Sequence, residues 1–168
     1  MWTARRIVKE LADVERRRRI LVAFWRFGDE TAKVMAVAQL AKALHFREES
    51  IRKLPVEKKA DLFGSRAAAP EFEQALDTAL MHYHTHEQSA LLGAFLDQWQ
   101  IPHVNGSIET EDYAAPSEEQ VRSSVRALDT FPPRDVAIYL ASAGLLMGED
   151  WRAATWPVVD EIAATLTV

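Results

Sequence analysis

Three histidines fall within five residues of one another in the stretch 82–87, which reads HYHTHE. Imidazole is a frequent metal ligand and a natural general acid or base near neutral pH. On an α-helix His82 and His86 are i and i+4 neighbours, so both rings can approach one ion. His84 points about 160° away from His82 and from the apolar stripe, and should lie outside such a shell. The spacing is therefore compatible with a zinc-like divalent site on one face of a helix.

A pair of histidines needs further ligands before it can hold a metal. The candidate ligands are His82, His86, Glu87 and His103, and in an enzyme Glu87 would act as acid or base and Tyr83 as donor. Further candidate ligands are His45 and three loop carboxylates: Glu109, Glu111 and Asp112. No His-Glu-x-x-His arrangement occurs, so the usual zinc-hydrolase division of ligands and base is missing. The simpler interpretation, which we prefer, is a polar layer in a helical core with no cofactor.

Four consecutive arginines, residues 16–19, form the other dense cluster. Arg18 falls within about 20° of the apolar stripe of the first predicted helix, whereas the other three point elsewhere. We expect Arg18 to be a structural buried charge paired with a carboxylate, because a buried guanidinium needs one. A nucleic-acid partner is not expected, since the net charge is -5 and no aromatic residues alternate with the arginines.

Helical periodicity and capping signals extend over most of the chain. The predicted helices cover residues 2–27, 29–46, 55–63, 70–101, 117–128, 133–147 and 150 onward. Val14 and Val34 lie on the apolar stripes of the first two, and Gly64 is expected to end the third. The Asn105-Gly106 pair suits a type I′ turn and predicts the one short β-ribbon. The sequence thus predicts an all-α fold, a single-domain bundle of six to eight helices over residues 1–168, with at most one very short β-ribbon near Asn105-Gly106.

Two of these helices leave alternatives open. Residues 70–101 are either one helix buried on two faces or two helices, since Thr85 and Gln88 match a capping box. If Thr85 starts a new helix, His82 loses its i+4 relation to His86. The last helix is expected to kink or restart at Pro157 with Thr155 as its cap. The predicted core includes seven residues: Leu21, Trp25, Leu40, Leu76, Leu92, Leu140 and Leu146.

Composition limits the classes of function. There is no cysteine, which excludes disulfides and thiolate zinc sites, and no glycine-rich phosphate loop. Neither a signal-peptide core nor a stretch of membrane-spanning length appears, so we expect a soluble, cytoplasmic protein without membrane contact. Five tryptophans and seven phenylalanines are generous for 168 residues and favour interface anchors as well as core packing.

The preferred function is a protein-binding or oligomerisation module that forms a homodimer through an apolar helical face. A metal- or histidine-dependent enzyme built on His82, His86 and Glu87 is the alternative. Whether the protein is an enzyme at all stays open in the sequence.

Overall fold

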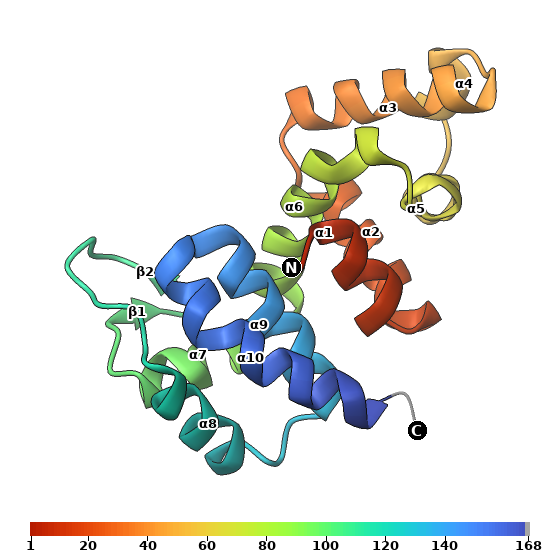
Figure 1. The fold of residues 1–168 in the computed structure, drawn as a ribbon. Helices are drawn as coiled ribbons and strands as arrows, with labels where there is room; N and C mark the ends of the chain where they lie inside the picture. The colour runs from red at the N-terminus through yellow and green to blue at the C-terminus, as the bar shows by residue number, and fades with distance from the viewer. Residues whose placement is uncertain (167–168) are drawn as a thin grey trace. The chain divides into compact units, whose positions relative to one another are not determined.

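The computed structural model describes residues 1–166, and its architecture is all-α (Figure 1). The described chain contains ten α-helices, two π-helical turns, one 3₁₀ turn and a single two-stranded ribbon. The predicted fold class is confirmed. The chain divides into two compact units, one of residues 3–83 and one of residues 1–2 together with the chain from residue 84 onward. A single domain over residues 1–168 stays a prediction.

The unit of residues 3–83 is built from helices and short turns. In chain order these are α1 (Ala4–Arg6), the π-helical turn η1 (Ile7–Leu11), α2 (Val14–Phe27), α3 (Glu30–Leu44), α4 (Glu48–Arg52), α5 (Val56–Arg66), the 3₁₀ turn η2 (Pro70–Phe72) and α6 (Glu73–His82). Helix α2 packs against α5 and α6, and it supplies the aromatic centre of this core. The Phe24 ring meets Trp25 and Phe63 edge-on, at centroid distances of 5.0 and 5.4 Å.

Three expectations about this unit are wrong. Residues 2–27 are not one helix, because Ala12 adopts an extended conformation (φ -83°, ψ 124°) and Asp13 caps a new helix by accepting a hydrogen bond from the Arg16 amide at 2.8 Å. Val14, expected on the buried stripe, is 80% exposed. Gly64, expected to end a helix, lies inside α5.

The second unit follows the π-helical turn η3 (Tyr83–Glu87). It contains α7 (Ser89–Gln98), β1 (His103–Val104), β2 (Ser107–Ile108), α8 (Glu118–Ala127), α9 (Pro133–Met147) and α10 (Glu149–Leu166). Helices α9 and α10 lie side by side, and α8 packs against α10 (Figure 1). Ring contacts among Phe95, Trp99, Tyr139 and Trp151 form its aromatic core.

Two local signals in this unit are confirmed. His103 pairs with Ile108 in the antiparallel ribbon, and the turn has positive φ at Asn105 (50°) and Gly106 (85°), as a type I′ turn requires. Ser117 caps α8 with the reciprocal bonds of a capping box to Gln120.

Helix α10 departs from its prediction because it continues through Pro157 without a restart. The Thr155 hydroxyl does not cap a helix but donates to the Trp151 carbonyl one turn earlier, at 2.8 Å. Close packing against α9 holds this region in place, since Gly144 of α9 lies directly against Thr155 and Trp156. Tertiary contact therefore overrides the tendency of proline to break a helix.

Most of the predicted core is confirmed. Leu21, Trp25, Leu40, Leu76 and Leu140 are buried. Two predictions are wrong: Leu92 is half-buried, because it packs over the backbone of Gly106 in the ribbon, and Leu146 is 42% exposed in the last turn of α9. Within the part of the chain that the structure describes, no helix is long and apolar enough to cross a bilayer.

Candidate functional site

The histidine cluster lies on the π-helical turn η3, which changes the direction of its side chains. A break does follow α6, but α7 has Gln88 as its N-cap and not Thr85 as the capping box predicts. A π-turn holds one residue more than an α-turn, so the side chains that follow it are rotated from their α-helical positions. His84 is buried, His82 is half-buried and His86 is exposed. The expectation that His84 points away from the apolar core is wrong.

His84 is held as a neutral ring. Its Nε2 lies 3.1 Å from the Ser142 hydroxyl oxygen, and that hydroxyl donates its own proton to the Ile138 carbonyl at 2.7 Å. The serine oxygen is therefore the acceptor, and His84 carries its proton on Nε2. Burial lowers the pKa of His84 to about 4, although the charge of Asp135 opposes the shift. A ring that is neutral and enclosed in this way is suited to packing, not to proton transfer with a substrate.

His103 also has a structural role. Its Nδ1 accepts the Gly106 amide proton at 3.0 Å and its Nε2 lies 2.9 Å from the Asp97 carboxylate. Its ring lies against Gly93, where an added Cβ would come within 3.2 Å of the His103 Cε1. The Nδ1 bond thus closes the turn of the ribbon, and the Nε2 contact fastens the ribbon to α7. A ring used in this way has no nitrogen left for a metal in this conformation.

The remaining predicted site residues do not form a metal centre in the structure. Tyr83 is buried with the Arg19 guanidinium 5.7 Å from its ring centroid, and Glu87 is exposed. Over residues 1–166 no group of three or more histidine or carboxylate side chains is placed to hold a metal ion. The metal hypothesis for His82, His86, Glu87 and His103 therefore has no geometric support.

Arg18 has the predicted partner but not the predicted burial. Its Nε lies 3.4 Å from the Asp61 carboxylate, and both side chains are about half exposed. The expectation of a buried Arg18 is wrong because the break before α2 shifts the phase of the apolar stripe. Its neighbour Arg17 is the more enclosed, donating to three backbone carbonyls at the end of η1 and just after it, at 3.1 to 3.4 Å.

The most unusual surface of the described residues is the solvent face of α3. One face of this helix is buried, through Ala36, Val37, Leu40 and Ala41. Beyond that face Val34, at its flank, is 49% exposed and Met35, on the opposite side, is 50% exposed, and no charged residue occurs between Lys33 and Lys42. A helix that is apolar nearly all round is normally buried on all sides. The expectation that Val34 faces the core is wrong, and its exposure leaves an uncovered apolar strip.

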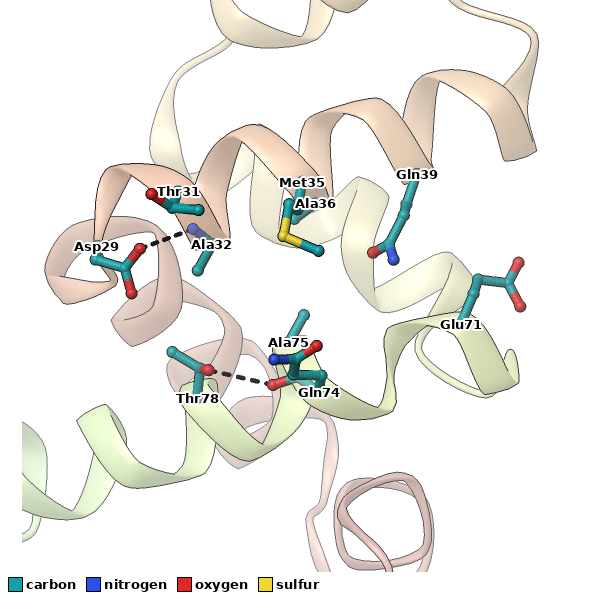
Figure 2. Close-up of a pocket in the computed structure, with 10 residues that line it drawn as sticks. All are labelled: Asp29, Thr31, Ala32, Met35, Ala36, Gln39, Glu71, Gln74, Ala75 and Thr78. Carbon is teal, nitrogen blue, oxygen red and sulfur yellow. Dashed lines mark hydrogen bonds between the residues drawn. The ribbon is translucent and has the colours of Figure 1, made fainter.

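A groove of about 170 Å³ lies beside this strip, between α3 and α6 (Figure 2). The two helices run in opposite directions there, since Asp29 faces Thr78 at one end and Gln39 faces Glu71 at the other. Its lining combines small apolar residues with polar ones: Asp29, Thr31, Ala32, Met35, Ala36, Gln39, Glu71, Gln74, Ala75 and Thr78. Met35 belongs to both the groove and the strip. The absence of charge over residues 34–41 was the sequence signal that marked this surface.

Polar groups at the groove are partly satisfied within their own helices. The Asp29 carboxylate accepts the Ala32 amide proton at 2.8 Å, and the Thr78 hydroxyl donates to the Gln74 carbonyl at 3.2 Å (Figure 2). The groove therefore offers apolar floor and few strong polar anchors. Such a lining suits a side chain from another protein better than a charged metabolite.

Comparison of the chain with protein-family models, curated proteins and solved structures finds no match. The class that the fold defines is an all-α protein with an apolar, outward-facing helix. Its function is therefore argued from its own surfaces.

Proposed function

We propose that this protein is a protein-binding module that forms a homodimer through the solvent face of α3. The observation that carries the proposal is the exposed apolar strip of Val34 and Met35 on a helix with no charge over residues 34–41. Two large hydrophobic residues that flank this helix in the sequence, Phe27 at the end of α2 and Phe46 just after α3, are also exposed. Contiguous exposed apolar surface of this kind marks association sites in soluble proteins.

The charges along α3 favour a second copy of the same chain as the partner. Acidic residues lie at its start, with Glu30 88% exposed, and the exposed Lys42 lies near its end. In a two-fold contact two copies of α3 run antiparallel, so Glu30 of each copy approaches Lys42 of the other. The helix dipoles oppose each other in the same arrangement, which adds a favourable term.

The groove beside α3 supplies the complementary shape. Ala32, Ala36 and Ala75 line it, and small side chains leave room for a larger one to enter. Val34 and Met35 of a second copy are apolar side chains that could enter this groove. Because one helix face and one groove form a small interface, we expect a weak dimer, with a dissociation constant of roughly 10 to 100 µM.

Sedimentation equilibrium tests the proposal. At about 100 µM at least half of the unaltered protein should be dimeric, and Val34→Lys with Met35→Lys should make it monomeric, because two ammonium groups would be buried against apolar surface. The control replaces Leu146 and Met147 with Lys, two residues that are similarly exposed on α9. Circular dichroism would verify that each variant is folded. An unaltered protein that is monomeric at this concentration contradicts the proposal.

A charge exchange tests the antiparallel arrangement itself. Glu30→Lys alone and Lys42→Glu alone should each weaken self-association, whereas a mixture of the two variants should associate because every contact is then complementary. The double variant should also recover. If the mixture associates no better than either variant alone, the two-fold arrangement is wrong even if the protein dimerises.

A further inference from the structure

The unit of residues 3–83 also contains two adjoining cavities in a different place, bounded by η1 and α2 on one wall and by α5 on the other. The smaller, of about 70 Å³, is lined by Arg5, Val8, Lys9, Arg17, Gly64, Ala67 and Ala68. The larger, of about 200 Å³, is lined by Val14, Arg17, Arg18, Leu21, Ala60, Asp61 and Gly64. Because Arg17 and Gly64 line both, the cavities form one elongated depression, which we call the α2–α5 depression.

The depression carries a net positive charge. Four of its lining side chains are cationic, Arg5, Lys9, Arg17 and Arg18, and Asp61 is the one lining carboxylate. Arg5 is paired with Glu73, outside the lining, at 2.6 Å. This agrees with the wider charge distribution, since sixteen of the chain's twenty lysines and arginines lie in residues 3–83. A cationic depression on an otherwise acidic chain selects a ligand of opposite charge.

Two of the cations are available to such a ligand. Lys9 is exposed and forms no ion pair with any described residue. Arg18 is joined to Asp61 only by a long contact of 3.4 Å between half-exposed groups, which a ligand carboxylate can replace. The Arg17 guanidinium donates its N–H groups to backbone carbonyls, so its side chain is held in place and contributes only its positive charge to the depression.

The floor of the depression is apolar and contains a glycine inside a helix. Gly64 lies in the last turn of α5, and within a helix glycine is less favourable than alanine. A Cβ at this position would come within 3.3 Å of the Leu21 Cδ1 and would fill the junction of the two cavities. Val14 is 80% exposed at the rim. The glycine thus keeps a hollow open next to an uncovered apolar side chain.

We propose that the α2–α5 depression binds an acidic peptide segment in which an aliphatic or aromatic side chain lies next to carboxylates. The apolar side chain would occupy the hollow over Gly64 and contact Leu21 and Val14, while carboxylates pair with Lys9 and Arg18. The apolar floor favours such a segment over a nucleic-acid strand, which needs aromatic stacking surfaces and phosphate contacts. This site shares no lining residue with the α3 surface and does not depend on dimer formation.

The test uses fluorescence anisotropy with the full-length protein at low salt. A suitable probe is a labelled peptide with the sequence of residues 106–115, GSIETEDYAA, because its three carboxylates lie between isoleucine and tyrosine. Arg18→Glu and Lys9→Glu should each weaken binding about tenfold through charge reversal. Gly64→Ala should weaken it several-fold without any change of charge. Since alanine favours a helix, loss of folding would not explain that result.

Matched controls separate this site from general attraction. Arg47→Glu makes the same charge change on an exposed residue that lines neither cavity, and it should leave the affinity nearly unchanged. A peptide with its acids changed to amides, and one with serine in place of isoleucine and tyrosine, should both bind weakly. The dimer variant, Val34→Lys with Met35→Lys, should bind the probe normally.

Three results would overturn the proposal. In the first, Arg18→Glu and Arg47→Glu lose affinity equally. In the second, a single-stranded oligonucleotide binds as tightly as the peptide, and in the third the probe does not bind at about 200 µM protein. The first two would show non-specific attraction of anions to a basic surface. None of these results tests the α3 dimer, which is tested separately by sedimentation equilibrium.

Discussion

The His84 Nε2 lies 3.1 Å from the Ser142 hydroxyl oxygen, and this bond joins the π-helical turn η3 to the middle of α9. The Tyr139 ring packs edge-on against the imidazole at a centroid distance of 5.5 Å. A histidine expected to face away from the core is thus part of its polar interior. The arrangement requires a neutral ring, and it therefore makes stability depend on pH.

We expect the protein to lose stability as the pH falls from 6.5 to 4 because of His84. Its pKa is lowered from 6.5 to about 4 by burial, so in this range the unfolded chain binds a proton that the folded chain refuses. The loss should reach roughly 3 kcal/mol at pH 4 and not grow below it. Urea unfolding at several pH values should show this part of the slope disappear in His84→Gln. His86→Gln, at an exposed position, should keep the full slope.

Asp77 should have the opposite effect. One of its carboxylate oxygens is buried without a hydrogen-bond partner, and its pKa is raised from 3.8 to about 6, first by burial and then by the charge of Glu73. Between these values the folded state keeps a proton that the unfolded state releases, so stability falls as the pH rises. Asp77→Asn should therefore raise the melting temperature at pH 7 but not at pH values below about 3.8. An equal gain at all pH values, or a gain in the exposed control Asp129→Asn, would contradict this explanation.

Gly144 should not tolerate a side chain. A Cβ there would lie 2.5 Å from the Trp156 Nε1 and 2.6 Å from the Thr155 Oγ1, both on α10. Gly144→Ala should therefore cost about 2 to 3 kcal/mol in urea unfolding, since α9 and α10 must move apart or the tryptophan must change rotamer. Ser123→Ala, which introduces the same residue at an exposed helical position, should change stability by less than about 0.5 kcal/mol. Similar effects in the two variants would mean that the close approach is not required.

Within the arginine run, Arg17 should matter for stability and Arg18 should not. Arg17→Ala removes three bonds to backbone carbonyls near the end of η1 and should cost about 1 to 2 kcal/mol. Arg18→Ala removes only a long, exposed ion pair with Asp61 and should cost less than about 1 kcal/mol. Thermal unfolding of both variants at the same pH gives the comparison. A larger loss for Arg18→Ala would restore the interpretation of Arg18 as a structural charge.

Much of the fold was predictable because its signals are local. Asp29 at the start of α3, Ser117 at the start of α8 and the Asn105-Gly106 turn each act through hydrogen bonds or backbone angles within a few residues. Neighbours far along the chain hardly alter such signals. The all-α class and most element boundaries follow from them.

The functional surfaces were harder to predict because the direction in which a helical side chain points depends on every helical turn that precedes it. His84 is buried because Ser142 and Tyr139 of α9 pack against it, and the extended Ala12 moves Arg18 outward and exposes Val14. At about 100° per residue, a single such irregularity moves a residue from the core to the surface. No local pattern marks where these irregularities fall.

The sequence by itself determined the helical class, the caps, the ribbon and the absence of cysteine chemistry. The tertiary structure alone decided which apolar residues are covered. Helix α3 has nearly continuous apolar periodicity, yet only its side with Val37 and Leu40 finds partners within the chain, and Val34 and Met35 are left outside. The burial of a helix depends on how many other elements pack around it, and the sequence of the helix itself does not specify that number.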